Sequence, residues 1–206
     1  MENIYLEEKS SYLTDGTIML EEEKNNIFSH EELQKLESLA DKLPFEHVEI
    51  GDADEPNYLD VGRLITDIDQ PKLVNESISK QVIDIVGSNK RMEFYKFLLD
   101  RSELHIRRMQ YNVMGEGCFV GMHLDTDSNP DYLVAVVIQL GENFKGGEYV
   151  VYGGGKPPRS FSPPRFSVIF SDCRYEHEVK KIKTGLRKSL VFFLSTNNGK
   201  NARKRN

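Results

Sequence analysis

The stretch His123-Leu124-Asp125 decides how the rest of this chain is interpreted. In a β-strand, residues two apart point to the same face, so His123 and Asp125 converge while Leu124 points away. A later block, Ser171-Asp172-Cys173-Arg174-Tyr175-Glu176-His177-Glu178-Val179, offers a second imidazole from a distant strand. Two imidazoles and one carboxylate on one face of an ion are typical of non-haem Fe(II) sites. The sequence therefore predicts a metal centre built from His123, Asp125 and His177.

Arg187 lies ten residues after His177 and just before the apolar run Leu190 to Leu194. A buried arginine needs an acidic partner, because an isolated buried charge is costly. Ser189, two residues on, shares the face of Arg187 in a strand. We expect Arg187 to bind a carboxylate of an acidic co-substrate, with the Ser189 hydroxyl donating to the same group.

The order of these residues resembles a known enzyme family. The pattern H-x-D, then a histidine, then R-x-S is similar to that of the 2-oxoglutarate-dependent Fe(II) dioxygenases, and most similar to their prolyl 4-hydroxylase branch. The resemblance covers about residues 103 to 195. Three further segments carry it: Tyr111 to Gly117, Phe144 to Glu148 with its Gly-Gly pair, and Ser171 to Val179.

The resemblance implies a set of ligands and a reaction. Fe(II), 2-oxoglutarate and O2 are the expected cofactor and co-substrates, and ascorbate is expected to stimulate. His123, Asp125 and His177 would be the metal ligands and Arg187 with Ser189 the site for the far carboxylate. The expected reaction is hydroxylation of an unactivated C–H, with release of succinate and CO2. Relatives that halogenate lack the carboxylate ligand, so Asp125 favours hydroxylation.

Two further residues have open roles. Tyr111 and Gln139 fall where family members place contacts near the co-substrate. Each could equally be a hydrogen-bonded polar group of the core. In place of Gln139 the oxygen-sensing members of the family often have a tyrosine.

Length and periodicity predict one α+β domain over residues 1–206. Residues 1–102 are expected to give helical support and a lid region, 103–195 a jelly-roll (double-stranded β-helix) catalytic core, and 196–206 a disordered basic tail. Eight strands are predicted near 104–113, 119–125, 132–141, 147–152, 158–162, 166–171, 177–183 and 187–195, which suits a jelly roll.

Helical spacing and turn residues organise the first half. The spacing predicts helices over 30–43, over 73–86 and from Ser88 to about Leu99, packed on the outer face of one sheet. The first has a capping box, Ser29 with Glu32. A strand is expected at 12–20 and an irregular lid at 45–70. The lid and the loop 126–131 are expected to border the substrate entrance.

The connection through Thr184-Gly185 decides where Arg187 lies. A tight hairpin there would put Arg187 roughly 16 Å from His177, too far for one small co-substrate. If the chain crosses instead to the facing sheet, the two residues look at each other across about 10 Å. We therefore predict the crossing. The Gly153 to Gly155 run is expected to be a hairpin connection.

Composition bounds the environment. The net charge of −6 argues against a nucleic-acid partner, and no apolar run approaches the length of a membrane span. Two cysteines are too few for a disulfide framework, and the first residues lack signal-peptide features. A cytoplasmic protein is expected.

Three functions compete. The first is hydroxylation of a prolyl or other peptidyl residue, and the second is hydroxylation of a free amino acid or small metabolite. The third is a non-catalytic metal-binding jelly roll. Arg63, Arg107 and Arg174 are unranked candidates for anchoring a substrate carboxylate, and Asp127 for a loop or substrate contact rather than a metal ligand.

Overall fold

The computed structural model describes residues 5–21 and 27–203 and consists mostly of antiparallel β-strands. The helices are α1 (Leu6–Asp15), α2 (His30–Ala40), α3 (Glu76–Val86), α4 (Asn89–Leu99) and the short α5 (Asp125–Ser128). The strands are β1 (Thr17–Leu20), β2 (Glu46–Ile50), β3 (Pro56–Asp67), β4 (Pro71–Leu73), β5 (His105–Met114), β6 (Phe119–His123), β7 (Val134–Gln139), β8 (Lys145–Gly146), β9 (Tyr149–Gly153), β10 (Lys156–Phe161), β11 (Val168–Asp172), β12 (Glu176–Val179), β13 (Ile182–Thr184) and β14 (Arg187–Ser195).

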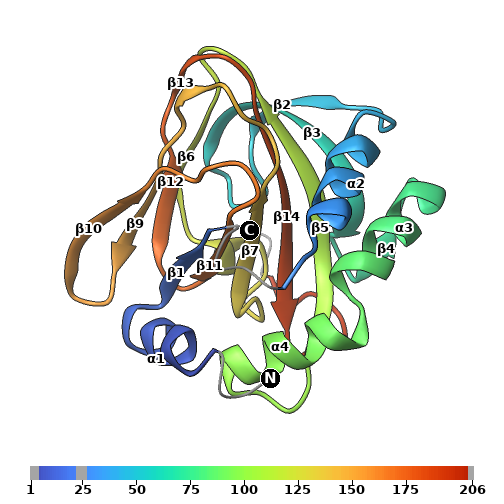
Figure 1. The fold of residues 1–206 in the computed structure, drawn as a ribbon, viewed down its shortest axis with the longest axis vertical. Helices are drawn as coiled ribbons and strands as arrows, with labels where there is room; N and C mark the ends of the chain where they lie inside the picture. Colours follow the sequence, from blue (N-terminus) through green and yellow to red (C-terminus); the bar gives the residue numbers. More distant parts are fainter. Residues whose placement is uncertain (1–4, 22–26, 204–206) are drawn as a thin grey trace.

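Two sheets form the predicted jelly roll, a nearly closed barrel (Figure 1). One has the order β1-β11-β7-β14-β5-β3, and the other has the order β6-β12-β9-β10. The long strand β3 joins them, because its first residues pair with β6 and later ones with β5. The interior between the sheets is therefore closed along the β3 side.

The helices cover the outer face of the first sheet, as predicted. Along β14, Leu190, Phe192 and Leu194 belong to the core cluster that includes the apolar faces of α2, α3 and α4. Val191, between them, points to the interior between the sheets. This alternation is the period of two that a strand imposes. Figure 1 shows α2, α3 and α4 along one side of the sheet.

Local signals explain where the helices begin and end. The Ser29–Glu32 capping box of α2 is present, with both hydrogen bonds formed. Helix α2 ends at Ala40 rather than at 43, and α3 begins at Glu76 rather than 73. The later start of α3 follows from Pro71–Leu73, which pairs with β3 as strand β4.

Two expectations for the first half are wrong. In place of the strand expected at 12–20, the residues up to Asp15 belong to helix α1 and only Thr17–Leu20 form a strand. Gly16, with a left-handed φ of 67°, ends the helix. Residues 45–70 are not irregular, since they contain β2 and the twelve-residue β3. Between the two strands, Gly51 to Glu55 forms the turn, and its polar composition masked the alternating pattern of β3.

The connection from β12 to β14 confirms the predicted crossing. Strand β12 pairs with β6 and β9, whereas β14 pairs with β5 and β7 of the other sheet. Gly185 has a φ of 84° in this crossing, and a Cβ there would lie 2.0 Å from the Asn143 carbonyl oxygen. The Gly153–Gly155 run is the hairpin connection between β9 and β10.

The tail makes contacts as far as Arg203. Asn201 donates to the carbonyl oxygen of Asp67 at 2.8 Å, and Arg203 binds the Asp54 carboxylate at 2.7 Å. Asn201 is thus held at the end of β3 and Arg203 at the β2–β3 turn, unlike the disorder expected for the tail. The basic residues after Arg203 lie outside the described residues. No helix in the described ranges is long and apolar enough to span a membrane.

Candidate active site

Neighbouring strands deliver the two candidate histidines to one place. His123 ends β6 and pairs in register with His177 of β12, so both rings extend from the same face of the sheet. Their ring centroids are 4.3 Å apart. The spacing of His123 and Asp125 suggested that both lie in one strand, but Asp125 is the first residue of α5. The chain bend after His123 still brings all three ligand atoms within 4.8 Å of one another.

Backbone carbonyls fix the orientation of both imidazoles. The Nδ1 of His123 lies 2.8 Å from the Gly121 carbonyl oxygen, and that of His177 lies 3.1 Å from the Tyr175 carbonyl oxygen. A carbonyl only accepts, so each Nδ1 carries a proton, and each Nε2 is the nitrogen that would offer its lone pair to a metal ion. Fixing the tautomer through the other ring nitrogen is common in metal sites.

Asp125 completes the donor set. Its carboxylate oxygens lie 3.3 Å from the Nε2 of His123 and 3.6 Å from that of His177. The side chain is 5% exposed, and Oδ2 has no hydrogen-bond partner among the described residues. A buried carboxylate oxygen without a donor is costly. A cation held between Asp125 and the two imidazoles would remove that cost, so the residues fit a metal ion.

The charges of the metal-free site follow from burial and contact. Burial opposes ionisation of Asp125, but His177 and His123 outweigh it and hold the pKa of the carboxyl below its ordinary value. Burial lowers the pKa of His177. Burial also opposes charge on His123, but its contact with Asp125 raises its pKa to about 9. The site is therefore built around a negative carboxylate.

Arg187 enters the same cavity from the facing sheet. It is 1% exposed, and its Nη1 lies 3.2 Å from the Ser189 hydroxyl oxygen and 3.6 Å from the sulfur of Met114. Its Nε and Nη2 have no hydrogen-bond partner in the part of the chain that the structure describes. Burial lowers the pKa of Arg187 to about 10. A buried guanidinium with free donors requires an acidic group, and residues 5–21 and 27–203 provide none in contact with it.

Tyr111 and Gln139 differ in where they point. The Tyr111 hydroxyl donates to the carbonyl oxygen of Leu36 in α2 at 2.8 Å, and the ring lies in the core beneath the helices. Tyr111 therefore faces away from the cavity, a correction to its expected contact. The Gln139 amide donates at 3.0 Å to two carbonyl oxygens, those of Gly141 and Lys188. A role of Gln139 toward the co-substrate stays a prediction.

The structure also ranks the arginine candidates. Arg63 lines the cavity, whereas Arg107 is buried against Asp67 and Arg174 is an exposed partner of Asp172. Asp127 is exposed, and the neighbouring Ser128 lines the cavity in its place.

Other residues of the cavity escaped sequence reasoning. Tyr149 stacks on His177 with a centroid distance of 5.1 Å, and Arg108, Glu55 and Asn57 also line the cavity. The alternation of side chains along β9 and β3 indicated that Tyr149 and Asn57 each lie on one defined face of their strand. Nothing in the sequence alone said which face of those strands is inside.

A jelly roll with two imidazoles and one carboxylate between its sheets, and an unsatisfied arginine facing them, defines a non-haem metal oxygenase site. Residues 109–195 match the family model of the 2OG-Fe(II) oxygenase superfamily. An oxidoreductase of the 2OG-Fe(II) oxygenase family from Burkholderia pseudomallei is 36% identical. That similarity covers 97% of this chain and 94% of the other, with a TM-score of 0.89. The chain belongs to the 2OG-Fe(II) oxygenase family.

More distant structures share the fold. A Trichoplax adhaerens prolyl hydroxylase, solved with a hypoxia inducible factor peptide fragment, is 14% identical with a TM-score of 0.68, covering 94% of this chain and 90% of that one. EctD from S. alaskensis, solved with 2-oxoglutarate and 5-hydroxyectoine, is 15% identical with a TM-score of 0.66, covering 92% and 75%. No curated protein matches. As a family member the protein is a dioxygenase that uses Fe(II), 2-oxoglutarate and O2.

Proposed function

We propose that this dioxygenase hydroxylates an unactivated C–H bond of its substrate, with His123, Asp125 and His177 as the iron ligands. Arg187 and Ser189 bind the far carboxylate of 2-oxoglutarate. The observation that carries the proposal is the pair of unsatisfied donors on buried Arg187, in the same cavity as the three ligands.

The balance of the reaction follows from the co-substrates. Substrate, O2 and 2-oxoglutarate give hydroxylated substrate, succinate and CO2, with one oxygen atom entering the product and one entering succinate. When bound, Fe(II) supplies the redox chemistry that couples the loss of CO2 to attack on the C–H bond.

The chain's own residues position the reactants. The planar guanidinium of Arg187 can hold a carboxylate through two parallel N–H bonds, which fixes both place and direction. The Ser189 hydroxyl, already 3.2 Å from Arg187, can add a third donor. The apolar side chains of Val137 and Val179 also line the cavity and help exclude water, which strengthens these contacts.

The three competing functions are not equally supported. A metal-binding protein without catalysis would gain nothing from burying Arg187 without an acid, so the catalytic function is favoured. The prolyl or peptidyl substrate is supported by the resemblance to the prolyl 4-hydroxylase branch. A small polar substrate is supported by the charged side chains in the cavity.

Two measurements test the proposal. Purified protein with Fe(II), ascorbate and 2-oxoglutarate should release succinate, and a substrate should increase the rate. In binding titrations, Arg187→Met should weaken 2-oxoglutarate binding about 10²–10³-fold, since a buried charge loses its partner. Fe(II) binding should stay near that of the wild type.

Arg174→Met is the matched control, because Arg174 is exposed and its ion pair is with its neighbour Asp172, outside the cavity. Arg187→Lys should recover part of the affinity, since the charge survives but the fork does not. Wild-type affinity for 2-oxoglutarate in Arg187→Met would show that the arginine is structural.

A further inference from the structure

The cavity contains a buried carboxylate, that of Glu55, which the proposed reaction does not use. Glu55, in the turn between β2 and β3, is 8% exposed and lines the same cavity as His123 and His177. A carboxylate is therefore held close to the reaction centre without being one of its three candidate ligands.

The turn is shaped to hold this carboxylate. The Gly51 amide donates to the Glu55 carbonyl oxygen at 2.8 Å, which closes the turn. A Cβ on Gly51 would lie 1.6 Å from Oε1 of Glu55, so only glycine leaves room for the side chain to fold back. The position of Glu55 is thus specified by the backbone.

The contacts of Glu55 leave its charge uncompensated. Oε2 accepts from the Ala53 amide at 3.0 Å, and Oε1 accepts from the Asn57 side-chain amide at 2.8 Å. Both donors are neutral. A buried carboxylate is costly unless a cation or charged donor is close. The donors present reduce that cost without balancing the charge.

Three arginines line the cavity, and the proposed function assigns Arg187 to 2-oxoglutarate, whereas Arg63 and Arg108 are already paired with other acids. Arg108 pairs with Asp52 at 2.5 Å. Arg63 binds Glu46 and also lies 3.9 Å from Asp52. Arg63 and Arg108 thus have carboxylate partners other than Glu55, and neither is ion-paired with Glu55 among the described residues.

Glu55 is also connected to the candidate metal ligands. Asn57, which donates to Glu55, accepts from the Gly121 amide at 3.2 Å, and the Gly121 carbonyl oxygen accepts from His123. A group bound to Glu55 would therefore sit near the iron site. Val137, Val191 and Phe193 also line the cavity and offer apolar surface to an aliphatic chain.

Resting on the function proposed above, we propose that Glu55 binds a protonated amine of the substrate. The substrate class is then an aliphatic amine, whether a free amine or amino acid or the amino group of a peptide. Glu55 sets specificity by charge, and the aliphatic chain carries the C–H bond to the iron site.

The test uses full-length protein loaded with 2-oxoglutarate and Co(II), an inert substitute for Fe(II). The probes are free lysine, ornithine, arginine and aliphatic diamines, a lysine-containing peptide, and each amine in its N-acetylated form. Binding is followed by thermal shift, and succinate release is then measured with Fe(II). At least one amine should bind about 10-fold or more tighter than its acetylated form.

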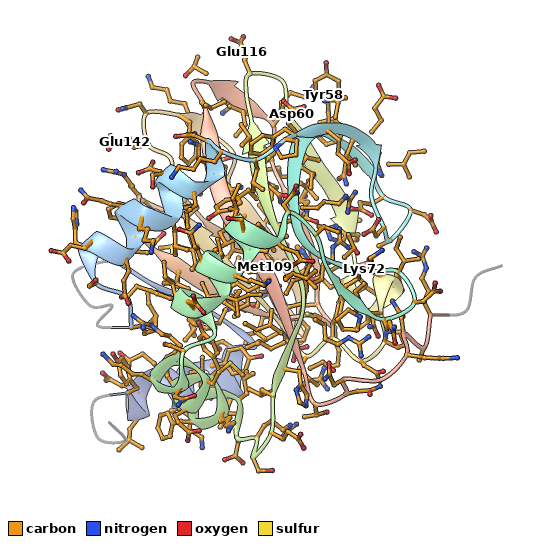
Figure 2. The ribbon with its side chains drawn as sticks, turned by 90° about the vertical axis from the view of Figure 1, so that its right-hand side faces the viewer. Tyr58, Asp60, Lys72, Met109, Glu116 and Glu142 are labelled. Atoms are coloured by element: carbon orange, nitrogen blue, oxygen red, sulfur yellow. The ribbon has the colours of Figure 1, made fainter. Side chains whose placement is uncertain are left out.

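Glu55→Gln should abolish that preference while leaving 2-oxoglutarate affinity unchanged. The matched control is Asp60→Asn, which removes one charge from the same hairpin. Asp60 pairs with His47 and lies at the outer edge of the molecule (Figure 2). A purely structural Glu55 would weaken charged and neutral probes alike, so the ratio between them separates the two roles.

Three results would overturn the inference. In the first, amines and their acetylated forms bind the wild type equally. In the second, no amine binds the loaded protein. In the third, Glu55→Gln keeps the preference. None of these results depends on how tightly Arg187→Met binds 2-oxoglutarate. A failure of the amine inference is therefore distinguishable from a failure of the proposed function. Whether the free amines or the peptide respond identifies the source of the amino group.

Discussion

Two buried regions of this molecule use the same kinds of charged residue in opposite ways. Around Asp67, Arg107 donates to both carboxylate oxygens, at 3.0 and 2.8 Å, and both side chains are fully buried. Asn129 and Tyr132 donate to the same carboxylate at 2.9 and 3.0 Å. In the cavity, Asp125 and Arg187 are almost as buried, but each has polar atoms without a partner among the described residues.

The difference separates structure from binding. The Asp67 network satisfies itself, and it holds the loop after α5 to β3 and β5. The cavity instead leaves polar atoms of Asp125, beside the two histidines, and of Arg187, on the facing sheet, without a partner among the described residues. A fold tolerates such a cost where a ligand removes it. The unsatisfied groups therefore mark the places of the metal and of the acidic co-substrate.

Removing a metal ligand should have the largest effect on function. Asp125→Ala, or alanine at His123 or His177, should abolish turnover, because two ligands cannot hold the ion in place. Succinate release and Fe(II) binding measure this. Full activity in any of the three variants would remove that residue from the site.

Breaking the satisfied network should have the largest effect on stability. Arg107→Met should destabilise the protein by roughly 3–5 kcal/mol, because Asp67 would remain buried without its cation. Arg187→Met should cost little or even stabilise, since that arginine has no acid to leave behind. Urea denaturation of the metal-free proteins compares the two. Equal losses would mean that Arg187 has a partner in the fold and that the contrast is mistaken.

With 2-oxoglutarate bound, replacing Arg187 should cost stability that it does not cost in the ligand-free protein. At a 2-oxoglutarate concentration 100-fold above the dissociation constant, the metal-loaded wild type should gain about 2.7 kcal/mol of stability. Arg187→Met should gain almost nothing at that concentration, whereas Arg174→Met should gain as much as the wild type. Thermal unfolding with Mn(II) in place of Fe(II) provides the measurement.

A smaller change sharpens the comparison from the other side. Tyr132→Phe removes one neutral donor from Asp67 and leaves its ion pair with Arg107 intact. We expect a loss of about 1.5–3 kcal/mol, the usual range for one hydrogen bond to a charged group. A loss as large as that of Arg107→Met would show that the hydroxyl, and not the charge, stabilises Asp67.

Much of the site could be predicted from the sequence because its residues lie in strands, where spacing fixes the face of each side chain. His123, His177 and Arg187 fall on regular strands, and the distance argument at Gly185 placed Arg187 on the facing sheet. The direction of Tyr111 could not be predicted in the same way. Its neighbours Gln110 and Asn112 line the cavity, and a shift of one residue exchanges the two faces.

The residues of the β2–β3 hairpin were missed for another reason. Glu55 and Asp52 lie in a turn rich in glycine, aspartate and proline, which reads as irregular. Their positions depend on pairing between β3 and both sheets, which joins residues more than fifty positions apart, such as Asn57 and Val120. A local pattern in the sequence does not contain that pairing.

The contact of Arg203 with the β2–β3 turn has a practical consequence for handling this protein. Arg203, the last residue that the structure describes, reaches both the Asp52 carbonyl oxygen and the Asp54 carboxylate in the turn that carries Glu55. Foreign residues fused close after Arg203 would put these two contacts of the turn at risk. Purification through an N-terminal tag, removed before assay, is therefore the safer choice when substrates are screened.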